Sequence, residues 1–171
     1  CLILNWAVHI FGLISDTHSY LDPQVFEYFK EVDEIWHMGD VGDAQLLDQL
    51  RAFKPLKGVY GNIDDRVIRQ ELPLDYRFVM EDMDIWMTHI GGYPGKYASR
   101  VRDILQIKPP DLFICGHSHI LKVMRDKKYN MLCMNPGAAG KHGFHKLRTL
   151  LRFHIKNKAL SNLEVIELGI R

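Results

Sequence analysis

Residues 9–18 read HIFGLISDTH, and this segment decides the fold because an apolar run ends abruptly in three polar side chains. A near-continuous apolar stretch over residues 9–15 is typical of a strand buried on both faces. Asp16, Thr17 and His18 follow it directly. The segment therefore predicts a first β-strand that carries polar groups to the carboxyl end of a sheet, where α/β proteins gather their ligands.

Strands and helices alternate through the first half of the chain. Helical spacing predicts helices over residues 23–32, 44–53 and 65–70, and apolar runs predict strands over residues 34–38 and 56–60. Such alternation is typical of strands connected by helices in an α/β protein.

The second half of the chain turns to hairpins. Residues 76–80 and 85–88 predict a hairpin, followed by a helix over residues 98–107 and a strand over residues 112–115. Antiparallel strands are expected in the last third, over residues 120–125, 129–134, 149–155 and 160–168. This order predicts a mixed α/β fold in which two mixed β-sheets pack face to face with helices outside.

Composition limits the classes of partner. The chain has 171 residues, 47% of them hydrophobic and 25% charged, so one globular domain is expected over residues 1–171. Its formal net charge of +1 provides no overall field to attract nucleic acid or an anionic membrane. Residues 141–158 contain six Lys or Arg and no acid, which an amphipathic strand with a solvated face explains better than a nucleic-acid surface. Nothing in the composition indicates an oligomeric state.

Cysteine content and apolar runs favour a cytoplasmic protein. Three cysteines without metal-type spacing argue against a disulfide framework and for a reducing compartment. Residues 1–8 are expected to be a short leader. They are not interpreted as a signal peptide, because the start of the chain lacks a basic region and a cleavage site. No run reaches the roughly 18 apolar residues that a membrane span requires.

Five polar signatures follow the expected strands. They are Asp16-Thr17-His18, Gly39-Asp40, Gly61-Asn62, His89 and Gly116-His117-Ser118-His119. Carboxylate and amide oxygens suit hard cations and imidazoles suit borderline ones, whereas no cysteine joins the set, which argues against a structural zinc site. Each signature alone is more common as a turn or a packed side chain. Together, at successive strand ends, they predict one site for a pair of divalent metal ions.

This series of motifs resembles the calcineurin-like metallophosphoesterases, and within them the small single-domain YfcE-type phosphodiesterases. The resemblance runs from Gly12 to about Ala139 and includes a further loop, Asn135-Pro136-Gly137. It implies a four-layer α/β/β/α sandwich and two metal ions bridged by Asp40. The other implied ligands are Asp16, His18 and His119 for the first ion, and Asn62, His89 and His117 for the second.

The implied activity is that of a metal-dependent phosphoesterase acting on a small phosphate ester. Water shared by two divalent cations loses a proton near neutral pH. The expected reaction is hydrolysis of a phosphodiester bond by in-line attack of this metal-bridging hydroxide, with inversion at phosphorus. Manganese is the first choice of metal, with Fe, Ni, Zn or Mg as alternatives. Whether the substrate is a diester or a monoester stays open.

Two positions depart from the family pattern. Many relatives carry a histidine after the Gly-Asn pair, where this chain has Ile63, and a second histidine two residues after the one matching His89, where it has Gly91. The acid for the leaving group is therefore missing from its usual places. Esters with good leaving groups, such as aryl diesters, are expected to be favoured.

Several nearby side chains are candidates for supporting roles. Tyr93, Lys96 and Arg100 lie in or after a glycine-rich loop and could contact substrate, although a solvated helix face is the slightly favoured interpretation of Lys96 and Arg100. His37 and Asp64 are candidates to orient ligands. The alternatives are a packed strand histidine for His37 and a helix N-cap for Asp64, the cap being slightly favoured.

Two other functions fit the same motifs. The fold also serves as a protein-interaction scaffold in the small subunit of the retromer coat, a relative with eroded metal positions, whereas every ligand position is filled here. Alternatively, the metal ions could be bound for stability alone. Chelation followed by melting and activity measurements separates these possibilities.

Overall fold

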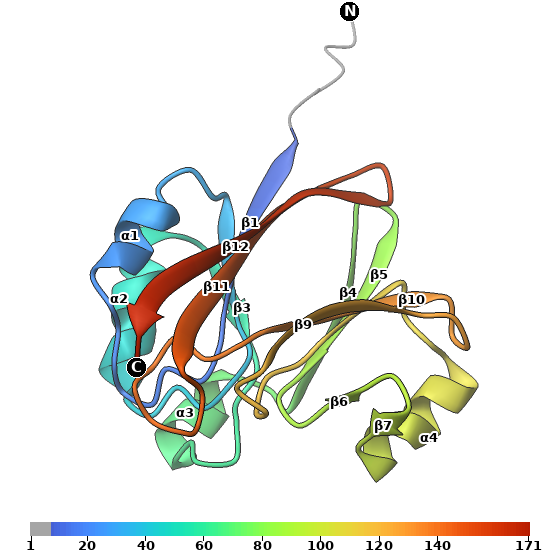
Figure 1. The fold of residues 1–171 in the computed structure, drawn as a ribbon, viewed down its shortest axis with the longest axis horizontal. Coiled ribbons are helices and arrows are strands. Elements are labelled where there is room, and N and C mark those ends of the chain that lie inside the picture. Colours follow the sequence, from blue (N-terminus) through green and yellow to red (C-terminus); the bar gives the residue numbers. More distant parts are fainter. Residues whose placement is uncertain (1–7) are drawn as a thin grey trace, which may run out of the picture.

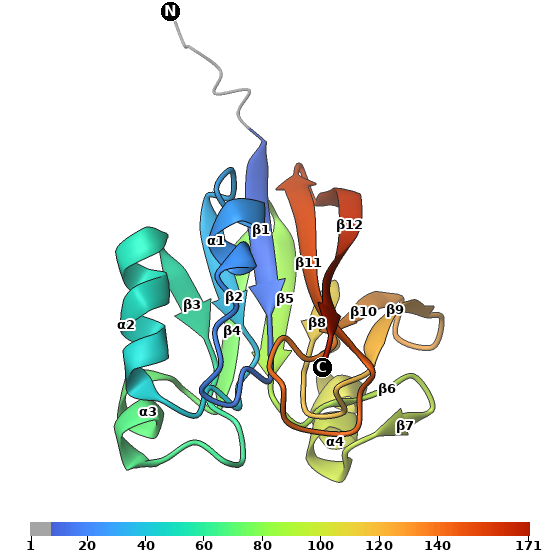
Figure 2. The same ribbon diagram turned by 60° about the vertical axis from the view of Figure 1, so that its left-hand side comes forward.

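Two five-stranded sheets pack face to face, with helices on their outer faces (Figures 1 and 2). The computed structural model describes residues 8–171, so the expected leader over residues 1–8 lies outside the described residues apart from Val8. The expected two-sheet α/β architecture is confirmed.

The first sheet has the strand order β12-β11-β1-β2-β3. Its members are β1 (His9–Ile14), β2 (Glu34–His37), β3 (Leu56–Gly58), β11 (Leu147–Lys156) and β12 (Ala159–Ile170). The first three strands are parallel, whereas β11 runs antiparallel to β1, and β12 antiparallel to β11. The helices on its outer face are α1 (Gln24–Tyr28), α2 (Ala44–Phe53) and α3 (Arg66–Glu71). Figure 1 shows these helices on the left of the molecule.

The second sheet has the order β4-β5-β8-β10-β9. Its members are β4 (Asp75–Met80), β5 (Met83–Thr88), β8 (Leu112–Ile114), β9 (Leu121–Asp126) and β10 (Met131–Pro136). Strands β5, β8 and β10 are parallel, and β4 and β9 flank them antiparallel. Helix α4 (Ser99–Ile107) covers the outer face, beside the small hairpin of β6 (Gly92–Tyr93) and β7 (Lys96–Tyr97).

Both faces of the central strands are buried, which explains their near-continuous apolar sequences. Leu13 of β1 packs between the two sheets, and its neighbour Ile14 packs against the helices. In β5, Met87 likewise points to the other sheet and Trp86 to α4. Three apolar layers therefore separate four layers of secondary structure, as the α/β/β/α sandwich requires.

Three details differ from the sequence predictions. Helix α1 ends at Tyr28 rather than at residue 32, because Phe29 leaves the helix and its ring fills the space above Gly12. The last third is not purely antiparallel, since β10 pairs parallel with β8. The β6–β7 hairpin was not predicted, because strands of two residues have no periodicity to detect. Within residues 8–171, no helix has the length and apolar character needed to cross a membrane.

Candidate metal centre

The predicted ligands converge where parallel strands of both sheets end. Asp16 and His18 follow β1, Asp40 follows β2, Asn62 follows β3, His89 follows β5, and His117 and His119 follow β8. Their imidazole and carboxylate atoms form two neighbouring clusters, each with ligand atoms within 4.8 Å of one another. We call them the Asp16 group (Asp16, His18, His119) and the Asp40 group (Asp40, His89, His117).

The Asp16 group contains a buried oxygen without a hydrogen bond. Asp16 Oδ2 accepts hydrogen bonds from Ser15 Oγ (2.5 Å) and from the backbone N–H of His117 (3.1 Å). Asp16 Oδ1 is buried and accepts none, although His119 Nε2 lies 3.2 Å away. A buried anionic oxygen is costly unless it is paired, so this atom is positioned as a cation ligand would be.

The Asp40 group also includes Asn62. Its amide Oδ1 lies 3.1 Å from His89 Nε2, and Asp40 Oδ1 lies 3.3 Å from the same nitrogen. The other carboxylate oxygen, Asp40 Oδ2, lies 3.7 Å from His18 Nε2 of the Asp16 group. Asp40 therefore stands between the two groups.

The backbone at these positions is strained. Five of the seven predicted ligands have a positive φ: Asp16 (52°), His18 (45°), Asp40 (53°), His117 (68°) and His119 (58°). For residues other than glycine, such a conformation costs on the order of 1–3 kcal/mol each and is concentrated at functional sites. Close approach is also required, since a Cβ on Gly61 would lie 2.0 Å from Asp40 Oδ1. The chain therefore accepts strain to bring these side chains together.

Hydrogen bonding orients the ring of His89. Its Nδ1 lies 2.6 Å from the carbonyl oxygen of Met38 and donates to it, so Nε2 is the nitrogen that faces Asp40 and Asn62. Burial alone would lower the pKa of His89, but the carboxylates of Asp40 and Asp16 outweigh burial and raise it. For Asp40 the directions are reversed. Burial alone would raise the pKa of Asp40, but the interaction with His89 outweighs burial, so the pKa of Asp40 is lowered.

Two histidines that sequence reasoning missed contact the Asp16 group. His145 donates from Nε2 to the carbonyl oxygen of Gly140 (2.9 Å), so its Nδ1 accepts from His119 Nδ1 (3.2 Å). Burial lowers the pKa of His145, in keeping with a neutral ring. The ring of His142 lies against that of His18, with centroids 4.8 Å apart. The available signal was a pair of histidines around Gly143, inside a segment interpreted by its basic charge.

His37 and Asp64 support the strand ends. Buried His37 accepts from the N–H of Gly39 (3.1 Å), and burial lowers its pKa to about 4. Asp64 accepts from the N–H groups of Gly61 (2.7 Å) and Gly42 (2.9 Å). The slightly favoured helix-cap interpretation of Asp64 is wrong, because Asp65 caps α3 by accepting from the N–H of Ile68 (3.1 Å).

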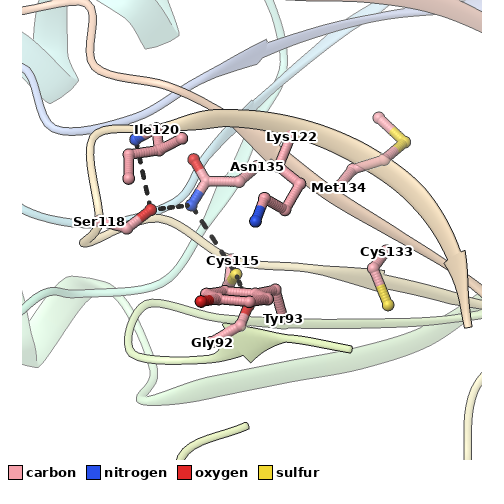
Figure 3. Close-up of a pocket in the computed structure, with 9 residues that line it drawn as sticks. All are labelled: Gly92, Tyr93, Cys115, Ser118, Ile120, Lys122, Cys133, Met134 and Asn135. Atoms are coloured by element: carbon pink, nitrogen blue, oxygen red, sulfur yellow. Dashed lines mark hydrogen bonds between the residues drawn. The ribbon is translucent and has the colours of Figure 1, made fainter. Parts of the chain in front are cut away.

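Asn135 holds the loop that carries His117 and His119. Its amide Nδ2 donates to the carbonyl oxygen of Gly116 (2.8 Å) and to Ser118 Oγ (3.1 Å), as Figure 3 shows in part. The same close-up shows Tyr93 below a small neighbouring cavity. Lys122 stacks on the Tyr93 ring at 3.5 Å from its centroid. Asn135, the first residue of the Asn-Pro-Gly motif, thus positions the loop of His117 and His119.

The three residues predicted to contact substrate, Tyr93, Lys96 and Arg100, do not line the cavity that opens beside the two groups, which we call the main cavity. Arg100 pairs with the carboxylate of Asp75 (2.6 and 3.1 Å) and donates to Thr88 Oγ1 (2.8 Å), so it does not simply solvate a helix face. It lines a separate cavity beside Asn62 and His89. Lys96 lies exposed in the short strand β7 rather than on a helix.

The main cavity has a volume of about 440 Å³ and opens beside both groups. It is lined by His18, Asp40, Asn62, Ile63, His117, Ser118, His119, Ile120, His142, Gly143, Phe144 and His145. The cavity therefore places four of the predicted histidine and carboxylate ligands in contact with a space large enough for a small molecule.

Comparison with known proteins defines the class. The family model described as the calcineurin-like phosphoesterase superfamily domain matches residues 10–158. The chain belongs to this superfamily, as the motif resemblance predicted. Membership implies the use of divalent metal, and the Asp16 and Asp40 groups are the candidate places for it.

Individual relatives agree with this assignment. A probable metallophosphoesterase of Methanocaldococcus jannaschii is 31% identical over 166 residues, covering 92% of this chain and 82% of the relative. The structure of an archaeal phosphodiesterase aligns with a TM-score of 0.72 at 21% identity, covering 93% of this chain and 99% of that one. Vps29 of Chaetomium thermophilum aligns with a TM-score of 0.74 at 19% identity, covering 95% and 90%. At such identities, these two structures establish a shared fold.

Proposed function

We propose that the protein is a phosphodiesterase that uses two divalent metal ions, with manganese as the first choice. The observation that carries the proposal is Asp16 Oδ1, a buried carboxylate oxygen without a hydrogen bond, lying 3.2 Å from His119 Nε2 and 4.0 Å from His89 Nε2. A cation beside this oxygen would remove the cost of burying it unpaired.

The donor set fits two ions. Asp16, His18 and His119 would hold one, Asn62, His89 and His117 the other, and Asp40 both. When bound, two divalent cations lower the pKa of a water molecule and offset the negative charge of a phosphate. Carboxylate, amide and imidazole donors together suit Mn²⁺ and its neighbours. Structural zinc is typically held by sulfur and nitrogen donors instead.

The chain's own groups turn the ligand nitrogens toward the proposed ions. His89 Nδ1 donates to the Met38 carbonyl, so Nε2 is the nitrogen that would face a metal ion. His145 has the same effect on His119, by accepting from its Nδ1. Burial lowers the pKa of His18 and of His117, which favours their neutral forms.

Charge favours a diester over a monoester. Among the described residues that line the main cavity, there is no Lys or Arg. A phosphodiester carries one negative charge, whereas a monoester carries about two at neutral pH. The second charge of a monoester would have to be met by the metal ions alone, without a cationic side chain, so a diester is the proposed substrate.

A leaving group that departs without an acid is also favoured. Ile63 stands at the cavity where relatives carry a histidine. At Gly91 no side chain fits, because a Cβ would lie 2.5 Å from that of Cys115. We therefore expect aryl esters to react faster than alkyl esters, with inversion at phosphorus.

The fold alone does not separate this proposal from an interaction scaffold, since Vps29 shares it. The complete donor set and the strained backbone at five of its members favour the enzyme. A reducing cytoplasm is supported by Cys115 and Cys133, which are unpaired and buried.

The test is metal add-back. Chelated protein is reloaded separately with Mn, Fe, Ni, Zn or Mg, and its melting temperature and its hydrolysis of aryl and alkyl monoesters and diesters are measured. We expect aryl diester hydrolysis to return with the metal. A higher melting temperature without hydrolysis would assign the ions a structural role. No response in either measurement would favour the scaffold.

A further inference from the structure

Three large apolar side chains border the main cavity and are exposed to solvent. They are Ile63 (48% exposed), Ile120 (60%) and Phe144 (103%), and all three line the cavity. Exposed apolar residues are ordinary when scattered, but a group of them around a polar cavity marks a binding surface. We call these three residues the apolar rim.

Two members of the apolar rim directly follow predicted ligands in the sequence. Ile63 comes directly after Asn62, and its N–H donates to Asp40 Oδ1 (3.1 Å). Ile120 comes directly after His119, and its N–H donates to Ser118 Oγ (3.3 Å).

Phe144 is held by the residues on either side of it. The next residue, His145, bonds both to His119 and to the carbonyl oxygen of Gly140. The preceding residue, Gly143, has φ +123°, and a Cβ there would lie 2.2 Å from His119 Nδ1. The backbone that carries Phe144 is therefore tied to the centre, as are those of the other two rim residues.

The cavity is lined by two kinds of side chain. Imidazoles, a carboxylate and an amide come from the candidate centre and the neighbouring loop, and the aliphatic and aromatic side chains are those of the apolar rim. A phosphate group suits the polar side chains. A ligand with further charged groups would find no Lys or Arg among the described lining residues. An apolar substituent on the phosphate would instead cover exposed apolar surface.

We propose that the apolar rim binds an apolar, preferably aromatic, ester group of a monoanionic phosphodiester. This inference rests on the proposed function for the identity of the reacting group. The aromatic preference follows from Phe144, whose exposed ring can stack on another ring. The rim thus selects substrates by the organic group that flanks the phosphate, not by further charge.

The first measurement is equilibrium binding of two inert diesters, diphenyl phosphate and dimethyl phosphate, to the Mn²⁺-loaded protein by calorimetry. We expect diphenyl phosphate to bind at least roughly tenfold more tightly. Phe144→Ser should reduce this ratio severalfold, and the side chain is so exposed that folding is not threatened. Ile107→Ser is the matched control, because Ile107 is 87% exposed on α4 and lies outside the cavity.

The second measurement is hydrolysis of methyl and phenyl 4-nitrophenyl phosphate, which share one leaving group. We expect kcat/KM to be higher for the phenyl ester in the wild type and the ratio to fall in Phe144→Ser. Equal binding and equal rates for phenyl and methyl compounds would overturn the rim, as would ratios that Phe144→Ser leaves unchanged. Preferential binding of diphenyl phosphate without any hydrolysis would keep the rim and reject the phosphodiesterase.

Discussion

The two groups of the candidate centre are held by different means. In the Asp40 group, His89 is oriented by the backbone carbonyl of Met38, at the end of a strand in the sheet core. In the Asp16 group, His119 is oriented by the side chain of His145, which a loop between β10 and β11 supplies. A carbonyl at a strand end cannot be removed by substitution, whereas a loop side chain can. The Asp16 group is therefore the part that sequence changes can adjust separately.

The largest effect is expected where the two groups meet. Asp40→Asn removes the carboxylate that lies 3.3 Å from His89 Nε2 and 3.7 Å from His18 Nε2. Because the charge is shared, both groups should lose metal affinity, and aryl diester hydrolysis should fall on the order of 10³-fold. Metal content by mass spectrometry and kcat/KM provide the measurement. Asp48→Asn, an exposed change on α2, is the control, and full metal content in Asp40→Asn would contradict the shared role.

The Asp40 group was easier to predict from sequence than the surroundings of the Asp16 group. Its ligands follow apolar strands directly, so pattern and register predict their position at the sheet edge. His145 and His142 lie in an irregular loop, where no periodicity fixes which way a side chain points. Tertiary contacts alone decide their place.

The same distinction holds for the fold. Strands buried on both faces, such as β1 and β5, can be recognised in the sequence by their apolar runs. The parallel pairing of β10 with β8 cannot be recognised in this way, because the sequence of β10 is compatible with either direction. Asp64 and Asp65 likewise differ by one position, and only the hydrogen bonds distinguish the residue that holds the Asn62 turn from the helix cap.

The strand that follows the loop of the Asp16 group carries a buried ion pair whose loss should be the next largest effect. Arg148, at the start of β11, donates to Asp22 Oδ2 (2.6 Å) and to the carbonyl oxygens of Leu168 and Ile170. Arg148→Met would leave the buried Asp22 carboxylate without its cation, so the free energy of unfolding should fall by about 3 kcal/mol. Urea unfolding at pH 7 gives the value. A loss below 0.5 kcal/mol would show that water replaces the pair.

The same ion pair gives stability a pH dependence. Burial alone would raise the pKa of Asp22, but hydrogen bonds from Arg148 and from the N–H of Gln24 outweigh it and lower the pKa. The stabilisation is therefore complete above the pKa of an unfolded aspartate, about 3.9, and is lost as the pH falls through the lower folded value. In Arg148→Met, this acid-dependent part of the unfolding free energy should shrink.

The smallest of these effects is expected from the side chain that orients His119. His145→Ala removes the acceptor for His119 Nδ1, so the proton is free to move to Nε2, the nitrogen that faces Asp16. Affinity for one of two Mn²⁺ ions should weaken about 10–100-fold, the usual effect of losing a partner of a ligating histidine. The affinity for the other ion, beside His89, should hold, because the Met38 carbonyl is untouched.

Calorimetric titration of chelated protein with Mn²⁺ resolves the two affinities. His145→Asn places an amide oxygen near the position of the lost Nδ1 and should restore most of the affinity, which a merely space-filling role for His145 would not explain. His154→Ala, on β11 and bonded to Asn162, is the matched histidine control. If His145→Ala weakened the binding of both ions equally, the two groups would not be held independently. The distinction between a partner supplied by a loop and one supplied by the sheet would then have no consequence for metal binding.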